Sequence, residues 1–296
     1  MELRVLRYFL TVAREENISR AAEALYITQP TLSRQLAELE EELGATLFIR
    51  GKRKITLTEE GMLLRRRAEE IAELEAKTEA EFRKRSESLS GTVSIGAAET
   101  RAAEIFPRAI ESFRQKYPDV TFDIYSDIAD HIKERLDRGL LDIGLLIEPG
   151  EIGKYEFMRL GIEDRCGILM SAKSELARKE YVTAEDLIGL PVVANRRASV
   201  RDFYRQHLGE AFDRLNIVAT FNLINNAALF ALQNRGYVFT VEGTLQNYRN
   251  PELVFRPFYP EISQSTFLIW KKYQPMSRTV SRFLEELRML TGHENA

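Results

Sequence analysis

The stretch "AEALYITQPTLSRQLAELE", from Ala22 to Glu40, contains the change of pattern that decides the fold of the N-terminal part. Apolar residues give way at Thr28 to a polar run, and leucines then recur at the spacing of a helix. Thr28 is expected to cap that helix, with Pro30 in its first turn, where a missing amide hydrogen costs nothing. A shorter helix over 20–25, with Ser19 as its N-cap, is expected just before it. Two short helices joined by a tight turn form a helix-turn-helix unit.

The polar run has the chemistry of a DNA-reading surface. In a helix-turn-helix unit the second helix lies in the major groove, and its first turns contact base edges. Gln29 can pair with adenine and Arg34 with guanine, while short hydroxyl side chains suit phosphate oxygens. The alternative is an ordinary helical hairpin with a solvated face. The candidate DNA-binding residues are Ser19, Thr28, Gln29, Pro30, Thr31, Ser33, Arg34, Arg50, Lys52 and Arg53.

The last three of these residues lie in a basic turn between two β-prone runs, which predicts a wing that contacts the DNA backbone or the minor groove. Residues 1–58 are therefore predicted to form one DNA-binding domain. A long helix with an imperfect heptad pattern follows over 59–88, about 45 Å long at 1.5 Å per residue. The region 59–90 is interpreted as a dimerising linker helix; the alternative is a helix packed on its own domain.

Residues 91–296 alternate strands and helices, which predicts an α/β domain with a parallel sheet. Hinges are expected near 162–165 and 265–266. The first subdomain would then hold 92–162 and 266–296, and the second 163–265.

Composition limits the function classes. The 296 residues carry a net charge of −3, so DNA binding must depend on local basic clusters. No signal peptide and no membrane span are expected, and the lone Cys166 fits a reducing cytoplasm. Nucleotide-binding and hydrolase motifs are missing from the sequence, and its three histidines are scattered. An enzyme and a metal site are therefore not expected.

The segment "FLTVAREENISRAAEALYITQPTLSRQLAELEEELGATLFIRGKRKITLTEEG", residues 9–61, resembles the N-terminal domain of LysR-type transcriptional regulators. The small-residue pair, "QP", "SRQ", "LE..LG..LF.R" and "LT..G" of that family are all present. The later order of elements is also similar. The resemblance implies a winged helix-turn-helix (mainly α), a long linker helix and an α/β two-subdomain effector domain like a periplasmic-binding protein.

The resemblance also implies partners. These are promoter double-stranded DNA, a small-molecule effector, RNA polymerase, and further copies of the chain in a homotetramer built as a dimer of dimers. No cofactor is implied.

An effector would lie between the two subdomains, at strand ends and helix N-termini. In the resembling family a small hydroxyl residue usually holds the inducer, which favours Thr100; the alternative is that Thr100 only caps its helix. Ser126 is a candidate at a strand end, or has no role beyond ending the strand. Arg196 and Arg197 are expected either to close on an anionic ligand or to be a solvated loop or subunit contact. If Glu99 and Glu148 both face the cleft, an amino acid or an amine is favoured over a plain dicarboxylate. The candidates are Glu99, Thr100, Arg101, Ser126, Ile147, Glu148, Asn195, Arg196 and Phe221.

Two other functions are compatible with parts of the chain. A redox-responsive regulator would use Cys166, although a lone cysteine in a predicted strand is usually a small core residue. A solute-binding protein without a DNA role would use only residues 91–296.

Overall fold

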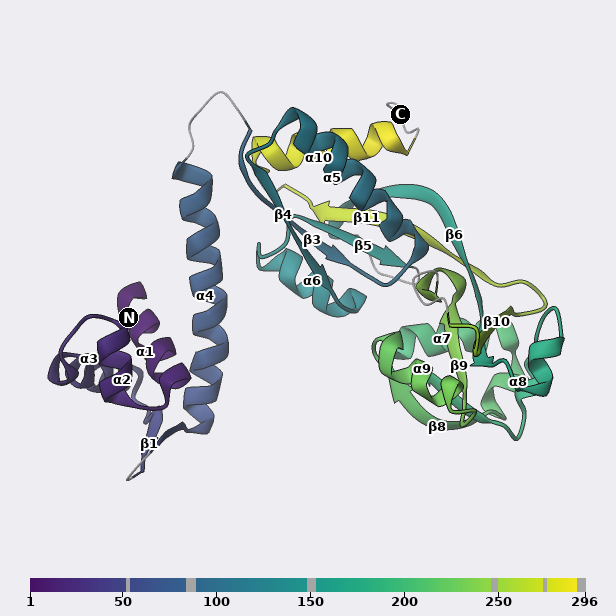
Figure 1. The fold of residues 1–296 in the computed structure, drawn as a ribbon, viewed down its shortest axis with the longest axis horizontal. Helices are drawn as coiled ribbons and strands as arrows, with labels where there is room; N and C mark the ends of the chain where they lie inside the picture. The colour runs from purple at the N-terminus through teal and green to yellow at the C-terminus, as the bar shows by residue number, and fades with distance from the viewer. Residues whose placement is uncertain (52–53, 84–88, 148–152, 246–249, 274–275, 292–296) are drawn as a thin grey trace. The chain divides into compact units, whose positions relative to one another are not determined.

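The computed structural model describes residues 1–51, 54–83, 89–147, 153–245, 250–273 and 276–291. The chain divides into two compact units, Met1–Arg85 and Ser86–Ala296. Figure 1 labels the elements of each unit.

The N-terminal unit is a three-helix cluster with a hairpin and a long helix. Its helices are α1 (Leu3–Glu15), α2 (Ile18–Ala24), α3 (Gln29–Leu43) and α4 (Glu59–Arg83). Phe9, Leu32 and Leu36 are fully buried in its core because they recur on the inward faces of α1 and α3. Thr28 caps α3 through its side chain, and Gly44 ends the helix in the left-handed conformation. The helix-turn-helix prediction is confirmed.

The cap of α2 differs from the prediction. Asn17 is the N-cap, and its side-chain oxygen accepts a hydrogen bond from the Arg20 amide at 3.0 Å. Ser19 lies inside the helix and is exposed. The helix begins two residues earlier than predicted because asparagine is at least as good a cap as serine and Ile18 packs against the core.

The hairpin consists of β1 (Phe48–Arg50) and β2 (Ile55–Leu57), paired antiparallel. It is joined to α3 by Glu40, whose carboxylate accepts hydrogen bonds from the Leu47 and Phe48 amides at 2.7 and 3.3 Å. The acidic end of α3 therefore anchors the start of the hairpin.

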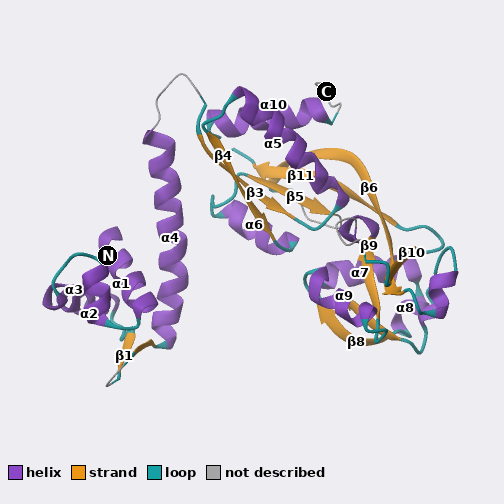
Figure 2. Cartoon of the chain, in the orientation of Figure 1, coloured by secondary structure: helices purple, strands orange, loops and turns teal. Residues whose placement is uncertain are grey.

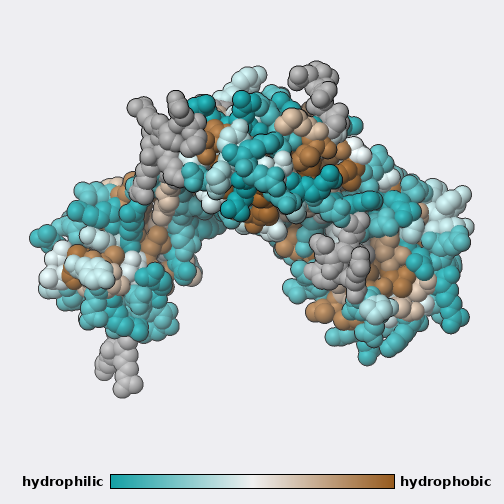
Figure 3. Space-filling view, turned by 45° about the horizontal axis from the view of Figure 1, so that its top comes forward, coloured by the Kyte–Doolittle hydropathy of each residue, from teal (hydrophilic) through white to brown (hydrophobic). Residues whose placement is uncertain are grey.

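The long helix α4 begins with Thr58, whose hydroxyl accepts from the Gly61 amide at 2.9 Å. Ala68 is fully buried, and Leu64 and Ile71 pack against the core of the same unit. These heptad residues thus contact their own domain. The apolar side chains Met62, Leu63 and Leu74 remain exposed on α4. Figure 3 shows apolar patches among mostly hydrophilic residues on the face in view.

The C-terminal unit is built on a nine-stranded sheet with the order β4-β3-β5-β11-β6-β9-β7-β8, and with β10 paired to β6. Its strands are β3 (Gly91–Ala97), β4 (Val120–Ser126), β5 (Ile143–Ile147), β6 (Tyr155–Ser171), β7 (Pro191–Asn195), β8 (Asn216–Phe221), β9 (Tyr237–Val241), β10 (Leu253–Pro257) and β11 (Ser263–Lys271). Its α-helices are α5 (Ile105–Lys116), α6 (Ala129–Asp137), α7 (Ala198–Leu208), α8 (Glu210–Asp213), α9 (Ile224–Leu232) and α10 (Arg278–Leu290). Short 3₁₀ turns are η1 (Arg101–Glu104), η2 (Glu175–Arg178), η3 (Glu185–Leu187) and η4 (Glu242–Leu245).

Two halves are visible within this unit (Figure 2). In the first, β3 pairs in parallel with β4 and β5, and in the second, β7 pairs in parallel with β8 and β9. The strands β6 and β11 run through both halves, and their register shifts between Ser265 and Phe267. Separate cores form in the two halves, around Phe106, Phe113 and Phe283 in the first and around Tyr204, Phe239 and Phe258 in the second. The α/β prediction with two subdomains is confirmed.

None of the described helices combines the length and the apolar character that a membrane crossing requires.

We expect Asn17→Ala to weaken the start of α2 by about 1 kcal/mol, because the Arg20 amide loses its acceptor. Hydrogen exchange of the α2 amides in the full chain should become about fivefold faster. Ser19→Ala is the matched control and should change exchange by less than twofold. An equal effect of the two substitutions would contradict the observed cap.

Candidate functional site

The first turns of α3 present an exposed polar surface on a buried leucine base. Thr28, Gln29, Pro30, Thr31 and Arg34 are exposed, and Ser33 is half-buried. Within the surface the Thr28 and Thr31 hydroxyls lie 2.8 Å apart, and Gln29 Nε2 donates to Ser33 Oγ at 3.1 Å. These bonds hold the polar groups in place before any partner arrives. The exposed helix N-terminus adds free amide hydrogens that favour a phosphate.

The remaining predicted contacts lie on α2 and in the hairpin. Ser19 is exposed on α2. Arg50 ends β1, with only its backbone described, and Lys52 and Arg53 lie outside the described residues. Lys54, the last residue of the basic turn, pairs with Glu16 at 2.8 Å.

Tyr26 was missed by the sequence reasoning. It lies between α2 and α3 with φ at +56° and is 97% exposed. An exposed aromatic side chain in this turn can contact the sugar-phosphate backbone beside α3. Its place in the turn directly before the cap residue Thr28 could have indicated that it is exposed beside α3.

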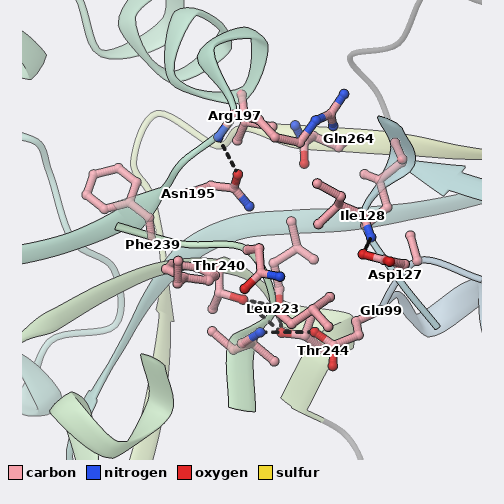
Figure 4. Close-up of a pocket in the computed structure, with 18 of the residues that line it drawn as sticks. Glu99, Asp127, Ile128, Asn195, Arg197, Leu223, Phe239, Thr240, Thr244 and Gln264 are labelled. Carbon is pink, nitrogen blue, oxygen red and sulfur yellow. Dashed lines mark hydrogen bonds between the residues drawn. The ribbon is translucent and has the colours of Figure 1, made fainter. Parts of the chain in front are cut away.

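The C-terminal unit contains a cavity of about 120 Å³ between its two halves. Four predicted residues line it, namely Glu99, Ile147, Asn195 and Phe221. Each follows or ends a parallel strand, and the carboxyl ends of such strands meet at one edge of a sheet. Figure 4 shows Glu99 and Asp127 on one side and Asn195 and Arg197 on another. Arg197, which was expected beside the ligand together with Arg196, also lines the cavity. Lining residues that the sequence reasoning missed include Asp127, Ile128, Thr240, Thr244 and Gln264.

Four other candidates are not among the lining residues, and Glu148 lies outside the described part of the chain. Ser126 and Arg196 are exposed. Arg196 does not line the cavity; the next residue, Arg197, which is the N-cap of α7, lines it instead. Arg101 lies in η1, and its amide is directed to Asp164 at 3.3 Å.

Thr100 also turns away from the cavity. It is 6% exposed, and its hydroxyl donates to the Asp164 carboxylate and accepts from the Ala102 amide at 3.2 Å. It thus caps η1, as its alternative interpretation expected. With its proton and one lone pair engaged, this hydroxyl has no donor left and keeps a single acceptor position for a ligand.

Two bonds cross the cavity from one half to the other. Arg197 donates through Nε and Nη2 to the two carboxylate oxygens of Asp130, at 2.9 and 2.8 Å. Glu99 Oε2 accepts from the Ile224 amide at 3.1 Å, at the first residue of α9. Both contacts are electrostatically favourable. The first is a bidentate ion pair, and the second places a carboxylate at a helix N-terminus.

Asp127 adds a second carboxylate to the wall. Burial acts to raise its pKa, but hydrogen bonds from the Tyr125 hydroxyl, the Ile128 amide and His131 outweigh burial and lower the pKa below its usual range. The tyrosine bond is 2.5 Å and the Ile128 amide bond 2.7 Å. Asp127 is therefore ionised at neutral pH, with its oxygens occupied.

Asp164 lies on β6, opposite the lining residue Gln264 of β11, and is 1% exposed. It accepts from Thr100 and Arg101, and a side chain at Gly243 would collide with its carboxyl. Burial raises the pKa of Asp164, although the hydrogen bonds act in the opposite direction. The Asp164 carboxyl group is thus hydrogen-bonded to the start of η1 and lies in close contact with Gly243 of η4.

Cys166 is fully buried in β6. Burial raises the pKa of its thiol to about 12, against the lowering effect of a hydrogen bond with Tyr204. A thiol with this pKa is a weak nucleophile, because the thiolate is the reactive form. Among the residues described, no group of three or more His, Cys, Asp or Glu side chains is arranged to hold a metal ion.

Comparison with known proteins gives matches over almost the whole chain. The model of the family described as "Bacterial regulatory helix-turn-helix protein, lysR family" matches residues 3–62, and the "LysR substrate binding domain" model matches residues 86–291.

Two curated relatives and one solved structure illustrate the similarity. The Hca operon transcriptional activator HcaR of Escherichia coli (strain K12) is 29% identical over 277 residues, which are 92% of each chain. The HTH-type transcriptional regulator BsdA of Bacillus subtilis (strain 168) is 31% identical over 73% of this chain and 74% of its own. The fold of full-length CbnR, solved in complex with its target DNA, matches with a TM-score of 0.77 at 20% identity, covering 98% of this chain and 99% of CbnR.

The raised pKa of Asp164 predicts a pH-dependent effect of Asp164→Asn. Because the folded state disfavours the ionised carboxyl, wild type should lose stability relative to Asp164→Asn as pH rises through that pKa. Below the unfolded pKa of about 4 the difference should be constant. Melting temperatures of both proteins at pH 4, 6 and 8 check this.

Asp164→Ala is the control for lost hydrogen bonds. At pH 4 it should be less stable than wild type by about 1–3 kcal/mol, because the Thr100 hydroxyl and Arg101 amide lose their acceptor, and this deficit should shrink as pH rises by the same amount that wild type loses against Asp164→Asn. If wild type instead became more stable relative to Asp164→Asn as pH rises, the pKa of Asp164 would not be raised in the folded state.

The Cys166 thiol should react with a thiol reagent roughly 10³-fold more slowly than free cysteine at pH 7.5, because its thiolate fraction is that much smaller. Iodoacetamide labelling followed by mass spectrometry measures the rate, with the urea-unfolded chain as the control. Labelling as fast as in the unfolded chain would restore the redox interpretation.

Proposed function

Because the chain belongs to the LysR family of bacterial transcriptional regulators, we propose that α3 binds promoter DNA in the major groove and that the C-terminal cavity holds its small-molecule effector. The chain is a transcriptional regulator with a DNA-binding helix-turn-helix domain and an effector-binding domain. The finer assignments, by residue, are the proposal.

One observation carries the DNA-binding part. The exposed surface of Thr28, Gln29, Thr31 and Arg34 lies over buried Leu32, so its polar groups have a rigid base. Arg34 is held only loosely by Glu38, with 3.6 Å between its Nε and the carboxylate, and is free to bind a guanine. Ser19 and the hairpin residues Arg50, Lys52 and Arg53 would add phosphate contacts.

The cavity supports effector control. Residues of both halves line it, and the Arg197–Asp130 and Glu99–Ile224 bonds cross it. A ligand that replaces or reinforces these bonds changes the relative stability of two arrangements of the halves. The effector contacts we propose come from Glu99, Asn195, Arg197, Phe221 and Gln264. Thr100 would act indirectly, by positioning η1 through Asp164.

Assembly belongs to the same proposal. The exposed apolar side chains Met62, Leu63 and Leu74 on α4 favour a partner on this helix, and a second copy of the chain fits. We propose a dimer of dimers that acts on RNA polymerase in the cytoplasm. The relatives are regulators and not enzymes, which opposes a catalytic role. The buried, weakly nucleophilic Cys166 opposes the redox alternative, and the helix-turn-helix match opposes a solute-binding protein.

We expect Arg34→Ala to weaken binding to specific DNA by about 1–3 kcal/mol, or about 5–150-fold, while sparing nonspecific DNA, because the bidentate contact to a base is lost. A DNase I footprint upstream of the protein's own gene, followed by titrations on the protected fragment and on random DNA, measures both. If the upstream region is not protected, selection of bound fragments from genomic DNA supplies the site.

Arg114→Ala, an exposed arginine in the last turn of α5, is the matched control and should leave both affinities unchanged. Equal losses on specific and random DNA for Arg34→Ala would show that Arg34 contacts only phosphate.

A further inference from the structure

We propose that the effector carries a cationic nitrogen, which pairs with Glu99, and a neutral oxygen acceptor, which binds Gln264, and that it is not a simple carboxylate. The inference rests on the proposed function, because it assigns the chemical class of the ligand to the same cavity. Of the two ligand classes that the sequence left open, an anion closed on by arginines and an amino acid or amine facing Glu99 and Glu148, it selects the second on the contacts of Glu99.

The positive features of the cavity are already neutralised by the protein itself. Arg197 uses two of its donors for the carboxylate of Asp130, and its side chain is only 12% exposed. The N-terminus of α9 is occupied by Glu99, which accepts from the Ile224 amide. An anionic ligand that used either of these positive features would have to displace one of the two carboxylates. No second lysine or arginine is among the described residues that line the cavity.

The negative charge of the cavity is, by contrast, incompletely compensated. Glu99 and Asp127 both line it. The oxygens of Asp127 are taken by Ile128, Tyr125 and His131. Glu99 Oε2 is taken by the Ile224 amide, and Oε1 has no hydrogen bond to any described residue. A carboxylate oxygen facing a confined cavity is best matched by an ammonium group, which gives a charge-assisted hydrogen bond.

Gln264 provides the second recognition element. It is 5% exposed on β11, opposite Asp164 in the register of β6, and it lines the cavity. Its Nε2 is buried and has no hydrogen-bond partner among the described residues. A buried donor left unpaired is costly, so a ligand that offers an oxygen there gains more than one that leaves it empty.

Asn195 points to the same conclusion. Its Oδ1 accepts from the Arg197 amide at 2.9 Å, which leaves its Nδ2 without a bond in the part of the chain that the structure describes. The cavity therefore offers two neutral amide donors and one anionic acceptor (Figure 4).

The remaining wall determines the body of the ligand. Its apolar part comes from Ile128, Phe221, Leu223, Phe239 and Val241, and Asn222, Thr240 and Thr244 add neutral polar groups. The volume of about 120 Å³ is on the scale of an engineered cavity of about 150 Å³ that binds benzene. A small amine with a short apolar body and one hydroxyl or carbonyl oxygen satisfies every group described.

Matched probes on the full-length protein test the proposal by isothermal titration calorimetry. Benzylamine, benzamide and benzoate share one ring and differ in charge, and butylamine, butyramide and butyrate repeat the comparison without the ring. Each ammonium should bind at least tenfold more tightly than its carboxylate. The 3-hydroxy derivative of benzylamine should bind more tightly than benzylamine in wild type, and Gln264→Leu should abolish that difference.

The variants at position 99 separate charge from fold. Glu99→Gln should weaken ammonium binding by about 10–150-fold, the range for a hydrogen bond to a charged group. Glu99→Asp keeps the charge and should retain part of the affinity. Glu111→Gln, the same exchange at an exposed position of α5 outside the cavity, should leave binding unchanged.

Three results would overturn the proposal: tighter binding of the carboxylates, no measurable binding of either ammonium, or ammonium binding that Glu99→Gln does not alter. None of these results bears on the DNA footprint, so a failure of the ligand class is distinguishable from a failure of the regulator function.

Discussion

The two halves of the C-terminal unit share the strands β6 and β11, and this covalent and hydrogen-bonded continuity is the constraint from which the cavity follows. Each half closes its own core, so the space between them is filled by neither. The shared strands keep that space narrow, and in their register Asp164 lies opposite Gln264, which lines the cavity. Polar groups with this degree of burial need defined partners, and the partners of Asp164 come from η1 and η4. The relative position of the halves is thus linked to hydrogen bonds at the shared strands.

The sequence predicted best where structure depends on neighbouring residues. The cap at Thr28, the end at Gly44 and the leucine face of α3 all follow from local rules. The prediction of Ser19 as the cap of α2 was wrong, because Asn17 lies two residues earlier, is as good a cap, and is followed by Ile18, which packs against the core. The bonds from Glu40 to the Leu47 and Phe48 amides could not be predicted from the sequence, because they depend on the direction in which α3 ends.

Prediction of the cavity was limited by contacts between distant residues. The ends of parallel strands correctly directed attention to Glu99, Ile147, Asn195 and Phe221, which line the cavity. Whether Arg196 or Arg197 lines the cavity depends on the residue at which α7 begins, which the sequence does not determine to within one position. The Thr100 hydroxyl is bound by Asp164, which is 64 positions away in the sequence. Gln264 could not be found because its position opposite Asp164 is a matter of strand register and not of composition. The first half of β6 and all of β10 escaped prediction for the same reason, since their pairing partners are remote.

The bonds from Glu40 have a consequence for how DNA preference can change. Because this side chain holds the first residues of the hairpin to the last turns of α3, the helix and the hairpin keep one fixed mutual angle. Transplanting only the exposed residues of α3 into a relative would therefore transfer the base contacts without the angle at which they are delivered. A graft that exchanges specificity between such proteins must carry position 40 and the hairpin amides together, as one inherited module.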